Sequence, residues 1–116
     1  MTRVFIINDS GHDFSDAARF GTLTVMTTGE IDRFNVMKMK RIFERHLLKS
    51  SPDDFILHTG PGVMSAVACA CFAGRHQRLN LLLWRAEYDG NDRYVHRKLI
   101  FKLYPTHEIS EEQDDS

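Results

Sequence analysis

Polar side chains are concentrated in one short segment near the start of the chain, Asn8-Asp9-Ser10-Gly11-His12-Asp13. The segment follows an apolar, β-branched run, so it lies where a buried strand would end. His12 could act as a general base with Asp9 or Asp13 beside it. The same groups could bind ribose hydroxyls or cap a following helix. The sequence offers no nucleophile with an adjacent base, so it favours binding or capping over catalysis.

A second segment, the glycine-bearing turn Thr59-Gly60-Pro61-Gly62, lies between a predicted strand at 54–59 and a predicted helix at 63–73. Glycine lets the backbone approach a ligand, and the first turn of a helix offers N–H groups with a partial positive charge. A phosphate or diphosphate is the natural ligand of such a turn, to which Thr59 and Ser65 could add hydroxyl donors. The turn matches neither GxxxxGK[ST] nor GxGxxG, so simple packing of strand on helix remains the alternative.

The elements that must position these segments are read from the hydrophobic pattern. Apolar runs predict strands at 3–8, 22–29 and 54–59, and Asp89-Gly90-Asn91-Asp92 predicts a hairpin between strands at 78–88 and 93–104. Three helices are expected between the strands: a short one from Asp13 or Ser15 through Arg19 that Gly21 closes in the left-handed conformation, an amphipathic one over 34–49, and a small-residue one over 63–73.

Alternating strands and helices predict the fold class, a small Rossmann-like three-layer α/β sandwich. Its sheet is expected to be mainly parallel with a C-terminal antiparallel hairpin. We expect one domain over residues 1–105 and an acidic, flexible tail over 106–116.

The carboxyl ends of parallel strands share one edge of a sheet, where ligands bind in open α/β folds. The two segments should therefore meet there. Arg19 could reach an anion, and Trp84 ends a strand near the same edge or lies at a partner interface. The residues expected to bind a ligand are Asn8, Asp9, Ser10, Gly11, His12, Arg19, Thr59, Gly60, Pro61, Gly62, Met64, Ser65 and Trp84.

The composition limits the class of partner. The 116 residues carry a formal net charge of −1 and are 42% hydrophobic, which is ordinary for one soluble globular domain. This balance gives no long-range attraction to nucleic acid, and Lys38, Arg41 and Arg45 read as a solvated helix face. No apolar run approaches a membrane span, and the start lacks a signal-peptide pattern. We expect a cytoplasmic protein that binds neither membrane nor nucleic acid.

Metal and cofactor sites are not predicted. The six histidines form no HxH, HxxxH or HxxE spacing, so a sequence-local zinc site is unsupported. Cys69 and Cys71 would lie about 200° apart around a helix axis, so they are expected to be buried small hydrophobic residues, not metal ligands or a disulfide. The open edge of the predicted strand at 94–103 is a pairing surface, and we expect a homo-oligomer.

Four stretches of the chain, "SGHDFSDAARFG", "SPDDFILHTG", "HQRLNLLLWRAEY" and "RYVHRKL", resemble a small protein family encoded mainly by bacteriophages. The resemblance extends to about residue 100 and carries little known chemistry. It implies an origin in a phage and action in the host cytoplasm.

A shorter stretch, "ILHTGPGVMSAVA", is similar to the strand-GG-x-x-G-x-M-helix element of the SLOG superfamily, Rossmann-like proteins that bind nucleotides and their derivatives. The resemblance makes Gly60, Gly62 and Met64 phosphate-loop candidates. The enzymatic branch of the superfamily, the LOG-type phosphoribohydrolases, has a PGGxGTxxE motif with a reacting Glu. Here Val67 and Ala68 are apolar where that acid would lie, so the resemblance does not imply catalysis.

Three functions remain open at this stage. SLOG domains act as receptors for nucleotide signals in bacterial antiphage defence, so a phage protein with such a site would work as a sponge that binds the signal. The alternatives are a hydrolase of a nucleotide derivative that uses His12 with Asp9 or Asp13, and an inhibitor that acts by direct protein contact through Trp84 or the basic helix.

Overall fold

The structure is a computed structural model that describes residues 1–87 and 90–101. In chain order its elements are β1 (Arg3–Ile6), the 3₁₀ helix η1 (Ser15–Arg19), β2 (Thr22–Val25), α1 (Val36–Leu47), β3 (Phe55–Leu57), α2 (Gly62–His76), β4 (Arg78–Arg85) and β5 (Arg93–Ile100). The expected tail over 106–116 lies outside the described residues. So do residue 88 of the predicted fourth strand, residue 89 of the predicted hairpin turn and residues 102–104 of the predicted last strand.

The strands form one five-stranded sheet in the order β2-β1-β3-β4-β5. Neighbouring strands from β2 to β4 pair in parallel, and β5 runs antiparallel to β4 from the pair Arg78–Ile100 to the pair Arg85–Arg93. The predicted C-terminal hairpin is thus confirmed. The prediction of a mainly parallel sheet is wrong. The sheet is mixed, since its longest strand pairing, between β4 and β5, is antiparallel.

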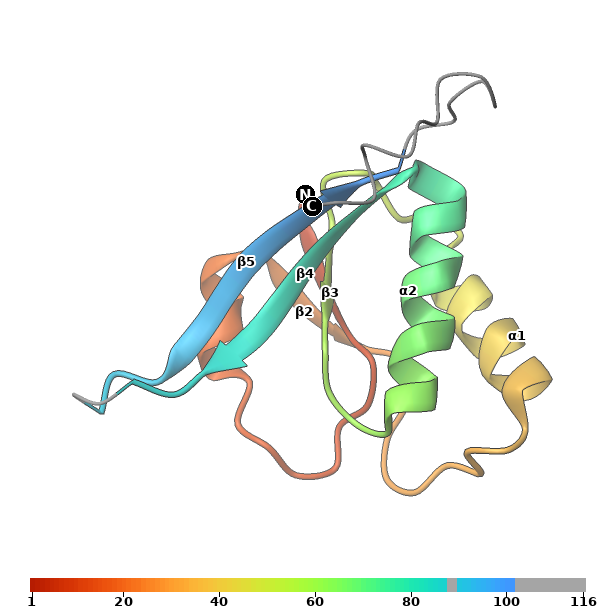
Figure 1. The fold of residues 1–116 in the computed structure, drawn as a ribbon, viewed down its shortest axis with the longest axis horizontal. Coiled ribbons are helices and arrows are strands. Elements are labelled where there is room, and N and C mark those ends of the chain that lie inside the picture. The colour runs from red at the N-terminus through yellow and green to blue at the C-terminus, as the bar shows by residue number, and fades with distance from the viewer. Residues whose placement is uncertain (88–89, 102–116) are drawn as a thin grey trace, which may run out of the picture.

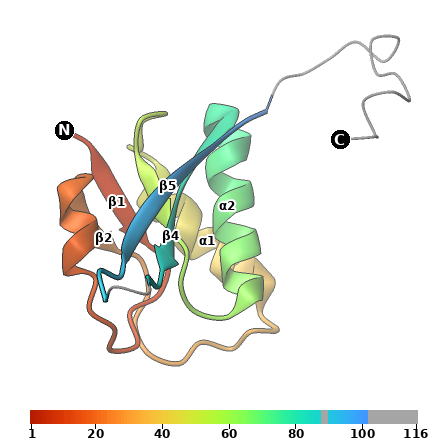
Figure 2. The ribbon, with the colours of Figure 1, turned by 60° about the vertical axis from the view of Figure 1, so that its left-hand side comes forward.

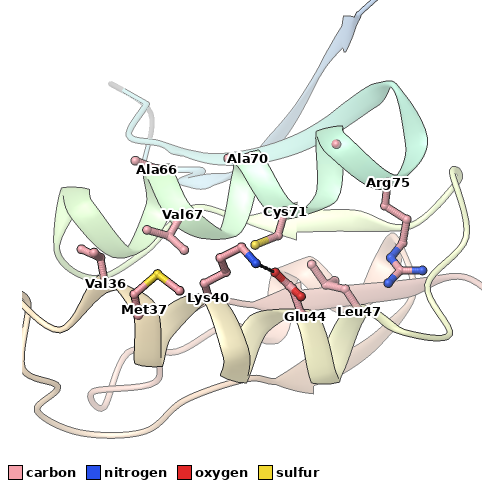
Figure 3. A pocket seen from close by; sticks show the side chains of 11 residues that line it. Val36, Met37, Lys40, Glu44, Leu47, Ala66, Val67, Ala70, Cys71 and Arg75 are labelled. Carbon is pink, nitrogen blue, oxygen red and sulfur yellow. Dashed lines mark ion pairs between the residues drawn. The ribbon is translucent and has the colours of Figure 1, made fainter.

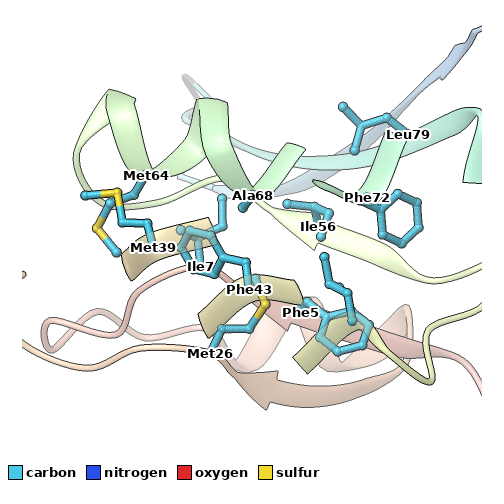
Figure 4. Close-up of a cluster of buried hydrophobic side chains, with 11 residues drawn as sticks. Phe5, Ile7, Met26, Met39, Phe43, Ile56, Met64, Ala68, Phe72 and Leu79 are labelled. Carbon is cyan, nitrogen blue, oxygen red and sulfur yellow. The ribbon is translucent and has the colours of Figure 1, made fainter. Parts of the chain in front are cut away.

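The two faces of the sheet are covered unequally (Figure 2). Both α1 and α2 pack on one face, where Phe5 of β1 meets Phe43 of α1 and Phe72 of α2 in the larger hydrophobic cluster (Figure 4). On the other face, η1 is the one helix among the described residues, and its Ala17 packs on Val4. The prediction of β1 as a strand buried on both faces is confirmed, because Val4 and Phe5 have no exposed surface.

The segment between β1 and β2 differs from the prediction in two respects. The short helix is a 3₁₀ helix whose N-cap, Phe14, makes no side-chain cap, and the Asp13 carboxylate accepts the Ser15 N–H at 2.9 Å. Gly21 is not left-handed. Instead, a Cβ at Gly21 would lie 2.6 Å from the Thr2 carbonyl oxygen, so glycine is needed because the chain passes close to the start of β1.

The two α-helices are capped at opposite ends, α1 at its start and α2 at its end. At the start of α1, the Asn35 side chain accepts the Lys38 N–H at 3.2 Å, which caps the predicted amphipathic helix. At the end of α2, Gln77 adopts φ 57° and its N–H donates to Ala73. No helix among the described residues is long and apolar enough to cross a membrane.

Candidate ligand-binding site

The order of the strands reverses direction between β1 and β3. The chain passes from β1 outward to β2, then returns past β1 to β3 and continues to β4. The loops that follow β1, β2 and β3 all emerge at one edge of the sheet, at the bottom of Figures 1 and 2. In open α/β sheets such a reversal leaves a crevice at the carboxyl ends of the strands, where ligands bind.

A polar cavity of about 380 Å³ lies at this edge. This volume is near the lower end of the range for small-molecule sites. The lining residues come from all three loops and are Asn8, Ser10, Gly29, Glu30, Ile31, Arg33, Gly60 and Pro61.

The loops after β1 and β2 are joined by backbone hydrogen bonds that continue the pairing of the two strands. The Asp9 N–H donates to the Thr27 carbonyl at 2.9 Å, and the Gly29 N–H donates to the Asp9 carbonyl at 3.0 Å. These bonds hold one wall of the cavity in place without using any side chain.

Asn8 lies at the base of this wall and is 2% exposed. Its Nδ2 donates to the Thr27 hydroxyl at 2.9 Å and to the Gly29 carbonyl at 3.0 Å. The Gly29 carbonyl can only accept, and the Thr27 hydroxyl spends its proton on the Ile7 carbonyl, so these partners fix the amide orientation. The Asn8 Oδ1 therefore has no donor among the described residues. The Oδ1 reaches solvent at the cavity, where it offers an acceptor to a ligand that brings an N–H or O–H group.

The turn after β3 forms the opposite wall. Gly60 has φ 87°, and a Cβ there would lie 3.1 Å from the Cβ of Asn8, so the turn approaches β1 closely and any larger residue would be strained. Pro61 is the N-cap of α2 and makes no side-chain cap. Its carbonyl accepts from Met64 and Ser65, which leaves the N–H groups of Gly62 and Val63 without an acceptor among the described residues.

Two opposite charges border the cavity. Glu30 and Arg33 both line it and both are exposed. Neither forms an ion pair or a hydrogen bond with the described residues. The cavity thus offers a guanidinium for an anion, a carboxylate for hydroxyl groups, and the Asn8 Oδ1 as a further acceptor.

Comparison with protein families assigns the chain. The model of the phage Pam3 gp32-like proteins matches residues 2–98. The chain belongs to this phage protein family. The match covers the whole sheet except the end of β5, so the cavity lies within the part that the family shares. Comparisons with curated proteins and with solved structures found no match.

Two of the three predicted acid–base residues of this phage protein, Asp9 and Asp13, accept hydrogen bonds from backbone N–H groups. The Asp9 carboxylate accepts the Gly11 N–H at 3.0 Å, and the Ser15 N–H and hydroxyl lower the pKa of Asp13. His12 is exposed and lies 6.2 Å from the Phe14 ring. The cavity lining includes none of these three side chains, and Asp9 and Asp13 each accept the N–H group two residues further along the chain.

The other predicted residues divide into those near the cavity and those away from it. Gly60 and Pro61 line the cavity, with Thr59 and Gly62 directly beside them in the chain. Ser65 is buried, with its hydroxyl 2.6 Å from Nδ1 of His58, and Met64 is in the core. Arg19 and Trp84 lie elsewhere: Arg19 pairs with Asp16 at 3.3 Å, and Trp84 packs on Tyr94 with ring centroids 5.0 Å apart.

Sequence reasoning missed the wall that follows β2. Gly29, Glu30, Ile31 and Arg33 line the cavity and were not among the predicted residues. A usable signal was present, since a strand paired in parallel beside β1 must end at the same edge, and the polar run "TTGEIDRFN" follows it. The Cys69 and Cys71 thiols are free, and burial raises the pKa of both.

Proposed function

We infer that this phage protein binds a small nucleotide-derived ligand at the carboxyl edge of its sheet and holds it without converting it. The observation that carries the proposal is the Asn8 Oδ1, an acceptor in a residue only 2% exposed that has no donor among the described residues and lies in the wall of a polar cavity.

The chemistry of the cavity favours a nucleotide over other small molecules. The Arg33 guanidinium and the free N–H groups of Gly62 and Val63 would hold a phosphate. The Glu30 carboxylate, on the loop after β2, would accept hydrogen bonds from ribose hydroxyls, the role that an acidic residue after the second strand has in dinucleotide-binding folds. The sequence resemblance of the turn at 59–62 to the SLOG element points to the same ligand class.

Capture is favoured over turnover because the described residues that line the cavity do not include a nucleophile with an adjacent base. The carboxylates of Asp9 and Asp13 accept backbone N–H groups outside it, and the predicted base His12 does not line it. A phage protein that sequesters a cyclic nucleotide or an ADP-ribose-type signal would deny that signal to a host defence. This is the biological role that we propose for the site.

The test is a ligand screen with recovery of the ligand. The protein is incubated separately with ATP, cyclic AMP and ADP-ribose, its melting temperature is measured, and bound material is released by heat and weighed by mass spectrometry. We expect one compound to raise the melting temperature and to be recovered intact. No shift with any of the three would contradict binding, and recovery of a cleaved compound would contradict capture.

A control variant distinguishes capture of the ligand from its hydrolysis. His12→Ala removes the predicted base without touching the cavity lining. We expect its ligand recovery to equal that of the wild type. Loss of turnover together with retained binding in this variant would instead support the hydrolase.

A further inference from the structure

A second hollow of the chain is an apolar groove of about 740 Å³ between α1 and α2, on the side of the helices away from the sheet (Figure 3). It shares no lining residue with the polar cavity. The charges of its lining have both signs, since Lys40 and Glu44 form an ion pair with each other and Arg75 adds a second cation. The lining therefore does not indicate what kind of partner would cover the groove.

The strands of the C-terminal hairpin, β4 and β5, carry charges of one sign. Their sequences, RLNLLLWR and RYVHRKLI, contain five arginine or lysine residues and no aspartate or glutamate. Two of the five cations pair with carboxylates. The other three have no ion-pair partner among the described residues: Arg93, Arg97 and Lys98. The expectation that the chain binds no nucleic acid rests on its net charge of −1, which conceals this local excess. A polyanion is the partner that such an excess attracts.

The face of the hairpin toward η1 brings exposed rings and a cation together. Tyr94 of β5 belongs to the hydrophobic cluster that includes Ala17 of η1. Side chains alternate across a sheet and Tyr94 pairs with Trp84, so Trp84, His96 and Lys98 lie on the same face as Tyr94. Trp84 is 51% exposed, and His96 and Lys98 are exposed as well. Diagonal neighbours such as Trp84 and His96 lie about 7–8 Å apart in an antiparallel pair.

The ring of His96 is held in place by two phenylalanines. Its centroid lies 4.9 Å from that of Phe55 and 6.5 Å from that of Phe20, edge to face in both pairs. Burial lowers the pKa of His96, and the cation of Lys98 lowers it further. The imidazole is therefore neutral at pH 7 and presents an uncharged aromatic surface.

We propose that this face of the hairpin binds single-stranded nucleic acid. Proteins that bind single strands stack the bases on aromatic side chains and hold the phosphates with cations. Trp84 and His96 supply two neighbouring rings, and Lys98, two residues beyond His96, supplies the cation. Bases within a duplex are stacked on each other and do not offer their faces to side chains, so a duplex is the poorer ligand. None of these three residues lines the polar cavity.

The first test measures binding of the full chain to a labelled oligothymidine of about 20 nucleotides, which exceeds the usual site size of such proteins. Trp84 is the only tryptophan of the chain, so its fluorescence reports on the proposed face directly. The oligonucleotide quenches Trp84 and binds less tightly as salt rises from about 50 to 200 mM. A duplex of the same length binds about tenfold more weakly, and polyphosphate, a polyanion without bases, leaves the fluorescence unchanged. Absence of binding at low salt, equal binding of the duplex, or quenching by polyphosphate overturns the proposal.

The second test reverses one charge at two exposed lysines. Lys98→Glu changes the proposed face, whereas Lys38→Glu makes the same change on α1, across the sheet. Lys98→Glu weakens oligonucleotide binding about tenfold or more and reduces the logarithmic salt slope by about 0.7 or more, the share of one phosphate contact. Lys38→Glu binds like the wild type. Neither lysine lines the polar cavity, so nucleotide capture is the same in both variants. Equal oligonucleotide binding by the two variants overturns the proposal.

The third test removes one exposed ring at two positions. Trp84→Leu takes a ring from the proposed face, and Phe34→Leu takes one that is 86% exposed just before α1. Trp84→Leu weakens oligonucleotide binding about fivefold or more, the effect of one lost stacking contact, and Phe34→Leu binds like the wild type. Melting temperatures confirm that both variants are folded. Equal affinities of the two folded variants show that Trp84 does not stack on a base and overturn the proposal.

Discussion

The apolar groove and the polar cavity differ in almost every physical property, although α2 borders both. The groove is the larger, about 740 Å³ against 380 Å³, and its walls are helix side chains. The cavity is formed by three loops at the reversal of strand order, and the Asn8 Oδ1 in its wall has no donor among the described residues. By volume alone, the groove would be the better candidate for a ligand site. We assign the ligand to the cavity, because it has hydrogen-bonding groups without partners, which a polar ligand recognises.

Two glycines of α2 allow this comparison to be tested, because one lies next to the cavity and the other lines the groove. Gly62 begins α2 directly after the residues that line the cavity, and Gly74 lines the groove. A Cβ would meet no atom within 4 Å at either position. A substitution at one glycine should therefore alter one hollow and leave the fold and the other hollow intact.

The largest expected effect is on ligand binding in Gly62→Glu. A carboxylate at the first turn of α2 would occupy the anion position and repel a phosphate, which should weaken nucleotide binding about 100-fold or more. The same carboxylate complements the helix dipole, so the melting temperature without ligand should stay equal or rise. Calorimetric titration and thermal melting measure the two quantities.

The matched control for this prediction is Gly62→Ala. It removes the glycine without adding charge, so the affinity should stay within about tenfold of the wild type, a difference below about 1.4 kcal/mol. Equal binding by Gly62→Glu would place the ligand away from the start of α2 and would break the distinction between the two hollows.

The next largest effect is expected for Arg33→Ala. Arg33 lines the cavity and has no ion-pair partner among the described residues, so its removal should cost little stability and weaken binding about tenfold. Arg41→Ala is the control, because Arg41 is an exposed cation on α1 outside both linings. If the two variants bind alike, a general positive charge is sufficient and the cavity is not specific.

The sequence allowed prediction of the elements and of part of the cavity lining, Asn8, Ser10, Gly60 and Pro61, but not of the wall after β2 or of the groove. The run of apolar residues at 3–7 and the period of α1 depend on local pattern, and both follow the structure closely. The meeting of the segments after β1 and β3 could be predicted because parallel strands share a carboxyl edge. Glu30 and Arg33 were missed because the position of β2 beside β1 depends on tertiary pairing.

Other differences from the prediction have the same origin. The sequence marks α2 as apolar on most sides, but which side meets the sheet and which remains exposed depends on packing. Arg19 was expected to reach an anion, and in the structure Asp16 and the Tyr94 carbonyl use its donors, an interaction between residues 75 positions apart in the chain. Local pattern carries no signal for such contacts.

A smaller effect is expected at the groove from Gly74→Ala. A glycine within a helix costs about 0.5–1 kcal/mol relative to alanine, so the monomer should gain this much unfolding free energy. The added methyl group would lie in the lining of the groove and leave the polar cavity unchanged. Urea unfolding at low protein concentration measures the gain. A loss of stability would show that packing within the chain does require glycine at this position.

The smallest expected effect is a pH dependence of the unfolding free energy that arises from His76, the last residue of α2. Burial lowers the pKa of His76, and Arg75 lowers it further. The unfolded state therefore takes up protons first, so stability is complete above a pH of about 6.5 and is lost as the pH falls toward the folded pKa. His96 on β5 has a pKa lowered by burial and by Lys98, and it adds to the same slope.

Urea unfolding between about pH 5 and pH 7 tests this dependence. His76→Gln should flatten part of the slope, and the double variant with His96→Gln should flatten more of it, because the two residues lie on different elements and act independently. An unchanged slope in the double variant would assign the acid sensitivity to other groups.

The most direct test of the central claim is a crystal structure of the protein grown with the nucleotide that raises its melting temperature. We expect the phosphate to lie at the N–H groups of Gly62 and Val63 beside Arg33, with a ligand donor on the Asn8 Oδ1. A nucleotide bound in the groove between α1 and α2, or a polar cavity left empty in the presence of the bound compound, would contradict the account.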